Sequence, residues 1–251
     1  MWQRDSHKQY TDIMRLIHIS DIHLTANGHP IWGVEPLAQF NRAVEKIKSL
    51  DEIDAVVISG DLSDDGSLWA YEYIDNTFAK LGLPTYCCPG NHDDLNVFFQ
   101  GFHPSFYLRN EVFRFGRWVF IMINSAITGM SRGHVDAKKL YDMIQSNDGP
   151  IGVVVHHPPI EQEGWLNRKL MENRDEFNKI IFQDNRVKLV LYGHSHCYTN
   201  KCINGIVYSS ASSICFAFHP SLPKFKIAHG NEGFSLITLE GLKVKVENIL
   251  I

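Results

Sequence analysis

The chain has 251 residues, of which 44% are hydrophobic and 21% are charged. This length supports one large domain with a substantial buried core, or at most two small domains. A formal net charge of −4 excludes a generally basic surface for nucleic acid or for an anionic membrane. No apolar run approaches the ~18 residues that span a bilayer, so we expect no membrane segment.

Cysteine content and the N-terminal segment predict the compartment and the domain limits. The five cysteines are an odd number without CxxC spacing, which favours reduced thiols in a cytoplasmic protein. Residues 1–13 are polar, lack the apolar region of a signal peptide and precede the first apolar run. We therefore expect residues 1–13 to be a loosely attached extension and residues 14–251 to form a single domain.

Short apolar runs recur along the chain, and each is followed by a turn. Their apolar and β-branched residues do not alternate cleanly with polar ones, which is typical of strands buried on both faces. These runs are 15–20 (RLIHIS), 55–60 (AVVISG), 83–90 (LPTYCCPG), 151–156 (IGVVVH) and 187–193 (VKLVLYG).

Segments with helical spacing and segments with hairpin turns lie between and after these runs. The candidate helices are 36–50, 67–82, 136–147 and 175–185, and the candidate hairpins are 112–125, 202–212 and the C-terminal segment 233–250. The hairpin turns are expected at Gly116, at Asn204–Gly205 and near Glu240–Gly241. Strands that alternate with helices predict an α/β fold, with two sheets flanked by helices and a hairpin at the C-terminus.

Each buried run ends at side chains that are able to bind a metal ion. In chain order these are Asp21, His23, Asp61, Asn91, His92, His156, His194 and His196. Parallel strands gather their carboxyl ends at one edge, so the groups converge on one crevice if the strands share a sheet. Imidazole and carboxylate together suit Mn²⁺, Fe²⁺, Co²⁺ or Zn²⁺ better than Ca²⁺.

Each motif alone has an ordinary structural explanation. The segment 90–93 (GNHD) is compatible with a simple turn, Asp61 with a helix cap, and 156–159 (HHPP) with a loop that proline ends. All five motifs occur together, however, and each follows an apolar run. This combination favours a metal site.

In this order, the motifs D-x-H, G-D, G-N-H, H-x-P and G-H-x-H resemble those of calcineurin-like metallophosphoesterases over residues 15–240. The compact size and the segment around 209–220 (SSASSICFAFHP) are most similar to class III cyclic-nucleotide phosphodiesterases. The resemblance implies a layered metallophosphoesterase sandwich of two mixed sheets. It also implies two divalent ions, with Mn²⁺ or Fe²⁺ ahead of Zn²⁺ or Co²⁺.

The resemblance further implies which residues bind each ion. One ion would take Asp21, His23, Asp61 and His196, and the other would take Asp61, Asn91, His156 and His194, with Asp61 shared. His156 is preferred to His157 because the family pattern has one residue between the histidine and the proline. In the segment 193–196 (GHSH), an extended backbone would place both histidines on one side. Asp64 stands where purple acid phosphatases have a tyrosine, which favours two divalent ions.

The implied reaction is hydrolysis of a phosphodiester, foremost a 3',5'-cyclic nucleotide, by a hydroxide that bridges the two ions. Asn91 would stabilise charge on the phosphoryl oxygens, and Asp61 would hold both ions. His92 would protonate the leaving group, with a structural hydrogen bond as the equal alternative. Asp93 is a candidate to orient His92 or Asn91.

Several roles stay open at this level. The alternatives for function are a glycerophosphodiesterase, a broad-specificity phosphomonoesterase or diesterase, and a non-catalytic metal-binding scaffold. Trp32 and Phe106–Tyr107 are candidates to stack on a base, His219 is a candidate pocket residue, and loops 24–36, 94–110 and 126–135 are expected to line the entrance. We expect a small-molecule substrate, no nucleic-acid partner, and a homodimer by likeness to relatives.

Overall fold

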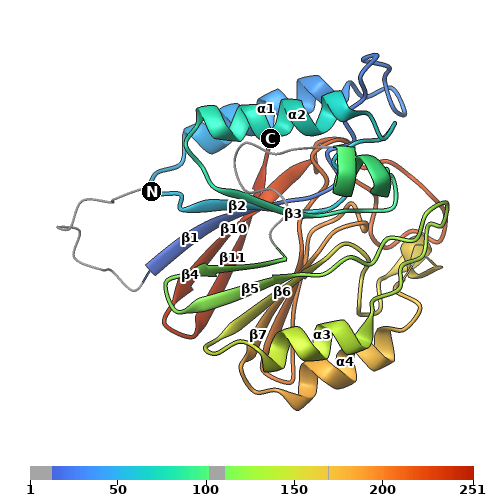
Figure 1. Ribbon diagram of the computed structural model, residues 1–251. Helices are drawn as coiled ribbons and strands as arrows, with labels where there is room; N and C mark the ends of the chain where they lie inside the picture. Colours follow the sequence, from blue (N-terminus) through green and yellow to red (C-terminus); the bar gives the residue numbers. More distant parts are fainter. Residues whose placement is uncertain (1–12, 102–110, 169) are drawn as a thin grey trace.

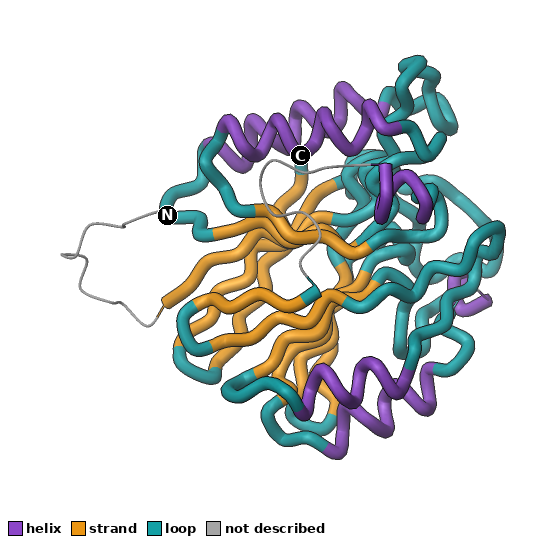
Figure 2. Tube along the Cα trace, viewed as in Figure 1, coloured by secondary structure: helices purple, strands orange, loops and turns teal. Residues whose placement is uncertain are grey.

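The computed structural model describes residues 13–101, 111–168 and 170–251. Two β-sheets pack face to face, and helices cover the outer face of each sheet, so that the molecule has four layers (Figure 1). Helices α1 and α2 lie on one side of the sandwich, and α3 and α4 lie on the other (Figure 1). Many of the loops that connect the strands to other elements gather at one edge of the two sheets (Figure 2). This arrangement confirms the predicted α/β sandwich.

The first sheet has five strands in the order β11-β10-β1-β2-β3. Strands β1, β2 and β3 are parallel, and the C-terminal hairpin β10–β11 adds to β1 in the antiparallel direction. The bounds are β1 Ile13–Ile19, β2 Ala55–Ser59, β3 Thr85–Cys88, β10 Gly233–Glu240 and β11 Lys243–Leu250.

The second sheet has six strands in the order β4-β5-β6-β7-β9-β8. Its four central strands are parallel, and a hairpin supplies the antiparallel strand at each edge. The bounds are β4 Val112–Phe115, β5 Trp118–Met122, β6 Ile151–Val155, β7 Val187–Tyr192, β8 Thr199–Ile203 and β9 Ile206–Ser210.

The four helices begin and end close to the predicted limits. They are α1 Pro36–Lys48, α2 Leu68–Lys80, α3 Ala137–Gln145 and α4 Arg174–Gln183, with short helical turns at Val97–Gly101 (η1) and Gly164–Arg168 (η2). In α1 the buried residues include Phe40, Val44 and Ile47, which recur at the spacing of one helix face. Pro36 lies in the first turn of α1, where backbone N–H groups have no partner within the helix, so its missing N–H costs no hydrogen bond.

Three apolar layers hold the sandwich together. Alternate residues of the central strands point to opposite faces, so Ile17 and Val56 pack toward α1 and α2 while Leu16 and Val57 pack toward the second sheet. Val153 lies in the third layer, between the second sheet and the helices α3 and α4. Both faces of each central strand are therefore buried, which explains why the strands read as continuous apolar runs.

The condition that all strands ending in polar groups share one sheet, under which the sequence predicted a common crevice, is not met. Strands β1, β2 and β3 belong to the first sheet, and β6 and β7 belong to the second. Their carboxyl ends still converge, because the two sheets face each other with their parallel strands ending at the same edge of the sandwich (Figure 1). The crevice is thus a seam between sheets.

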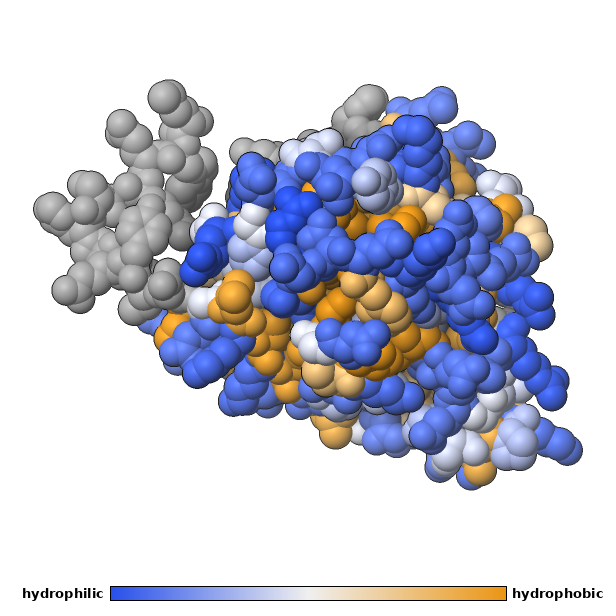
Figure 3. Space-filling view, turned by 90° about the horizontal axis from the view of Figure 1, so that it is seen from below, coloured by the Kyte–Doolittle hydropathy of each residue, from blue (hydrophilic) through white to orange (hydrophobic). Residues whose placement is uncertain are grey.

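The remaining observations concern the ends and the surface. Strand β1 begins at Ile13, and residues 1–12 lie outside the described residues, as do Phe106–Tyr107 and part of the expected loop 94–110. Among the described helices, none has the length and apolar character to cross a membrane. The face that carries α3 and α4 is mainly hydrophilic, with apolar side chains visible near its middle (Figure 3).

Candidate metal centre

The polar strand ends take an unusual backbone conformation. Positive φ angles occur at Asp21 (55°), His23 (51°), Asp61 (52°), His194 (64°) and His196 (47°). Non-glycine residues rarely adopt this left-handed region, and such strain concentrates at functional sites. The extended backbone expected for the segment 193–196 is therefore wrong. Left-handed turns after the strands aim these side chains into the seam.

Glycines at three strand ends let the strand ends approach each other, between the two sheets at Gly60 and Gly193 and within the first sheet at Gly90. A Cβ atom on Gly60 would lie 2.4 Å from Nδ1 of His156, and one on Gly90 would lie 2.1 Å from Oδ1 of Asp61. A Cβ atom on Gly193 would lie 1.9 Å from Oγ of Ser20. Any side chain at these positions would displace a polar group of the seam, so only glycine fits.

One group of four side chains brings two carboxylates and two imidazoles together. It consists of Asp21, His23, Asp61 and His196, all buried, with one possible ligand atom of each within 4.8 Å of the others. Nδ1 of His196 lies 2.8 Å from the carbonyl oxygen of Phe216, and Nδ1 of His23 lies 3.0 Å from Oδ1 of Asp64. Because a carbonyl or carboxylate oxygen only accepts, each Nδ1 donates.

Each Nε2 of a neutral His23 or His196 ring therefore carries a lone pair. These two Nε2 atoms lie 3.3 Å apart, and Nε2 of His196 is also 3.3 Å from Oδ1 of Asp21. Burial lowers the pKa of His23 against the opposing effect of Asp64, so this ring favours the neutral form. Lone pairs that converge in a buried space are costly to leave unmatched, which favours a cation between them.

A second group forms on the other side of Asp61. Nδ1 of His156 donates to the carbonyl oxygen of Ser59 at 2.7 Å, which leaves Nε2 facing Oδ1 of Asn91 at 3.2 Å and Oδ2 of Asp61 at 3.3 Å. Oδ2 of Asp61 is also 3.7 Å from Nε2 of His23. Among the described residues, Oδ2 of Asp61 and both ring nitrogens of His194 are buried without a hydrogen-bond partner.

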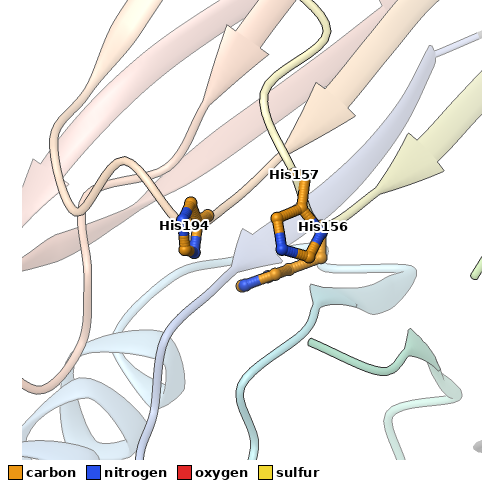
Figure 4. A group of neighbouring side chains, drawn as sticks. All are labelled: His156, His157 and His194. Carbon is orange, nitrogen blue, oxygen red and sulfur yellow. The ribbon is translucent and has the colours of Figure 1, made fainter. Parts of the chain in front are cut away.

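His157 lies in this second group as well. One ring nitrogen each of His156, His157 and His194 falls within 4.8 Å of the other two, and the three rings gather from the ends of β6 and β7 (Figure 4). Nδ1 of His157 is 2.8 Å from Oγ of Ser125, and burial together with the charge of His156 lowers the His157 pKa to about 3. The sequence pattern selected His156 over His157, whereas the structure places both beside His194.

Electrostatics in the seam couple proton binding to metal binding. Burial alone would lower the pKa of His156, but the carboxylates of Asp61 and Asp21 outweigh it and raise the value to about 9. Burial alone would raise the pKa of Asp61, but His156, His23 and His92 hold it well below its usual range. A cation would take the place of the His156 proton, so metal affinity should rise with pH. The donor set of nitrogen and oxygen atoms fits two divalent ions.

Asp64 links the centre to the more exposed His92. Nδ1 of His92 lies 2.9 Å from Oδ1 of Asp64, the same carboxylate oxygen that contacts His23. Burial opposes protonation of His92, but Asp64 and Asp61 outweigh it and raise its pKa. The sequence pattern singled out Asp64 only as a replaced tyrosine and missed this contact. The position of Asp64 on the turn that directly follows Asp61 was the sequence feature that could have indicated this contact.

Asp93 has a different role from the one expected. Its buried carboxylate accepts hydrogen bonds from the backbone N–H groups of Gly90, Ser63 and Leu62, and from the Tyr71 hydroxyl. These contacts tie the turn after β3 to the turn after β2. Thus Asp64, and not Asp93, is bonded to the His92 side chain.

Two further histidines lie apart from the ligand groups. His18 is fully buried in β1 with Nε2 2.8 Å from Oγ of Ser59, whereas its Nδ1 has no hydrogen-bond partner among the described residues; it is a core histidine with one of its two nitrogens bonded. His219 is exposed, and its backbone N–H donates to the carbonyl of Lys226. Among the described residues, no hydrogen bond, ion pair or ring contact joins the His219 side chain to the metal centre.

Comparison with known proteins places this geometry among phosphoesterases. The family model described as calcineurin-like phosphoesterase matches residues 14–198. A 3',5'-cyclic-nucleotide phosphodiesterase of Nostoc sp. is 30% identical, with 89% of this chain and 87% of the relative covered. The 3',5'-cyclic adenosine monophosphate phosphodiesterase CpdA of Escherichia coli K12 is 26% identical, with 85% and 81% covered.

A solved structure supports the fold independently. A dimetal phosphatase from Danio rerio superposes with a TM-score of 0.65 at 11% sequence identity, covering 94% of this chain and 98% of that chain. At this identity the likeness speaks for the fold alone. The sandwich fold is therefore shared with a protein described as a dimetal phosphatase.

Proposed function

This chain belongs to the calcineurin-like phosphoesterase family, and we propose that it hydrolyses a 3',5'-cyclic nucleotide. The family makes it a metal-dependent phosphoester hydrolase. The observation that carries the proposal is the set of lone pairs that converge in the seam: Nε2 of His23 and His196 at 3.3 Å, beside two buried carboxylates. Such a set has no purpose without cations.

The ligand sets that the family resemblance implies are supported by the clustering of these side chains. One divalent ion would be held by Asp21, His23, Asp61 and His196, and the other by Asp61, Asn91, His156 and His194. When bound, such ions lower the pKa of a water molecule and offset negative charge on the phosphoryl oxygens. Mn²⁺ or Fe²⁺ is the proposed native metal, with Zn²⁺ or Co²⁺ as alternatives.

The residues beside the ligands prepare the site for a diester. The side-chain amide of Asn91 is positioned to donate to a phosphoryl oxygen, while its Oδ1 faces Nε2 of His156. The side chain of His92 is 44% exposed, so a leaving group is able to reach it. Its bond to Asp64 keeps the ring oriented and favours the protonated form that a general acid needs.

The choice of substrate follows the named relatives. Both relatives above are described as phosphodiesterases of cyclic nucleotides, and each is covered over more than four fifths of its length. Glycerophosphodiesters and phosphomonoesters are the alternatives. No arginine contacts the ligand groups among the described residues, and a dianionic monoester would gain most from one.

A substrate panel with the Mn²⁺-loaded enzyme tests this proposal. We expect kcat/KM to be higher for 3',5'-cyclic AMP than for glycerophosphodiesters, and higher for diesters than for p-nitrophenyl phosphate. If p-nitrophenyl phosphate exceeds every diester, the diesterase assignment is wrong. If metal binds and bis-(p-nitrophenyl) phosphate is not hydrolysed, the chain is a metal-binding scaffold.

We also propose a cytoplasmic location, supported by five cysteines that form no disulfide, four of them buried. The homodimer expected by likeness to relatives stays a prediction. Size-exclusion chromatography with light scattering measures it directly.

A further inference from the structure

A tight turn near the metal centre presents an exposed tryptophan. Ile31 and Val34 exchange backbone hydrogen bonds of 2.8 and 2.9 Å, and the two residues between them, Trp32 and Gly33, have φ angles of 52° and 80°. Turns with positive φ at both central positions favour asparagine and glycine. A tryptophan here is strained, and its side chain is 63% exposed. A large aromatic side chain that stays mostly exposed at a strained position points to a ligand.

Aromatic rings connect Trp32 to the metal centre without a break. The His196 ring stacks on Phe218 with centroids 4.4 Å apart, Phe218 contacts Phe225 at 5.1 Å, and Phe225 contacts Trp32 at 4.9 Å. Trp165 contacts Phe218 at 5.7 Å and Phe225 at 5.5 Å. We call Trp32, Trp165, Phe218 and Phe225 the aromatic wall.

The wall is fixed to the ligands by the backbone. The N–H of Phe218 donates to the carbonyl of His196 at 2.8 Å, and the carbonyl of Phe216 accepts from Nδ1 of His196. Ile31 and Val34, on either side of Trp32, pack in one apolar cluster with Phe216 and Phe218. The turn is thus anchored to the segment that orients a proposed ligand, and the wall keeps its place relative to the phosphate site.

We propose that the aromatic wall binds the base of the substrate nucleotide by stacking, with Trp32 as its outermost ring. This inference rests on the proposed function and names the part of the substrate that the metal centre does not recognise. The metal centre suits the anionic phosphate, whereas the wall offers flat apolar rings. Every nucleobase has a π face, so stacking tolerates base identity. The enzyme should therefore require a base and discriminate weakly between bases.

Replacing Trp32 by alanine tests the wall on the Mn²⁺-loaded enzyme. We expect kcat/KM for 3',5'-cyclic AMP to fall about tenfold, mainly through KM, since a stacked ring contributes roughly five- to more than a hundredfold in affinity. Turnover of glycerophosphoethanolamine, which has no aromatic group, should change less than about twofold. Trp32→Phe should retain most of the activity on cyclic AMP. Trp69→Ala is the matched control, because Trp69 is 36% exposed on α2 and contacts Tyr73.

An equilibrium measurement separates binding from turnover. In titration calorimetry, Trp32→Ala should weaken binding of 5'-AMP about tenfold and leave binding of ribose 5-phosphate unchanged. Equal losses for ligands with and without a base would overturn the role of the aromatic wall. No hydrolysis of any cyclic nucleotide by the wild type would instead refute the proposed function, which the variant comparison does not decide.

Discussion

The second nitrogen of each imidazole determines how that histidine takes part in the site. Carbonyl oxygens fix the rings of His156 and His196, whereas a carboxylate fixes the ring of His23. A charged acceptor makes the ring a stronger electron donor than a carbonyl does. Because Asp64 also bonds His92, the proposed ligand His23 and the proposed acid His92 share one counter-charge. A substitution of either histidine should therefore change the hydrogen bond that Asp64 makes to the other.

His92→Ala should lower kcat on cyclic nucleotides by about 10²–10⁴-fold with metal content unchanged, because general acid catalysis contributes by that order. The loss should be smaller for bis-(p-nitrophenyl) phosphate, whose leaving group needs no proton. Metal analysis and steady-state kinetics check both statements, with the exposed His219→Ala as the control. An equal loss on both substrates would indicate a positioning role, and loss of metal would make His92 a ligand or a structural support.

The buried His18 predicts a dependence of stability on pH. Burial lowers its pKa from 6.5 to about 3, so between these values the unfolded chain binds a proton that the folded chain does not. The free energy of unfolding should therefore fall as the pH decreases from 6.5, by up to roughly 1.4 kcal/mol per pH unit. Urea unfolding of metal-free protein at pH 7 and pH 5 measures this, and His18→Gln should flatten the dependence. An unchanged slope in the variant would contradict a neutral His18.

At the scale of elements, the sequence predicted the strands and helices well because burial and periodicity are local properties. A strand such as β2 is apolar on both faces, and α1 carries its apolar residues on one side. Two sheets were predicted, but the sheet to which each strand belongs was not predictable, since an apolar run specifies burial and not a neighbour. The same limit applies to His157 and Asp64: both lie next to motif positions, but their partners, Ser125 and His92, come from other segments.

Helix α3 has a cap that its sequence supplies directly. The side chain of Asp136 accepts a hydrogen bond of 2.9 Å from the backbone N–H of Lys139. Asp136→Ala should lower the free energy of unfolding by about 1 kcal/mol and leave activity unchanged. The matched control is Glu35→Ala, because Glu35 precedes α1 without a side-chain cap bond and should change stability by less than about 0.5 kcal/mol. Equal effects in thermal unfolding would contradict the role of the cap.

At the scale of the whole molecule, the two halves of the sandwich each supply part of the metal centre. Asp21, His23, Asp61 and Asn91 follow strands of the first sheet, and His156, His194 and His196 follow strands of the second. Each proposed ion would therefore bind across the seam. Without cations, the seam holds the two buried carboxylates of Asp21 and Asp61 close together. It also holds the His194 ring, whose two nitrogens have no hydrogen-bond partner among the described residues. Metal binding should consequently stabilise the packing of one sheet on the other.

The expected result is two Mn²⁺ ions per chain and a higher melting temperature when Mn²⁺ is added to chelator-treated protein. A ligand at 100 times its Kd stabilises the folded state by about 2.7 kcal/mol, which corresponds to roughly 5–10 °C for a chain of this size. Asp61→Ala should lose both ions and most of the shift, since Asp61 lies between the two groups, whereas His196→Ala should weaken mainly one. The surface variant Asp142→Ala should behave like the wild type. One ion or none at saturating Mn²⁺, with the ligands intact, would refute a dinuclear centre, and two ions without a thermal shift would refute stabilisation across the seam.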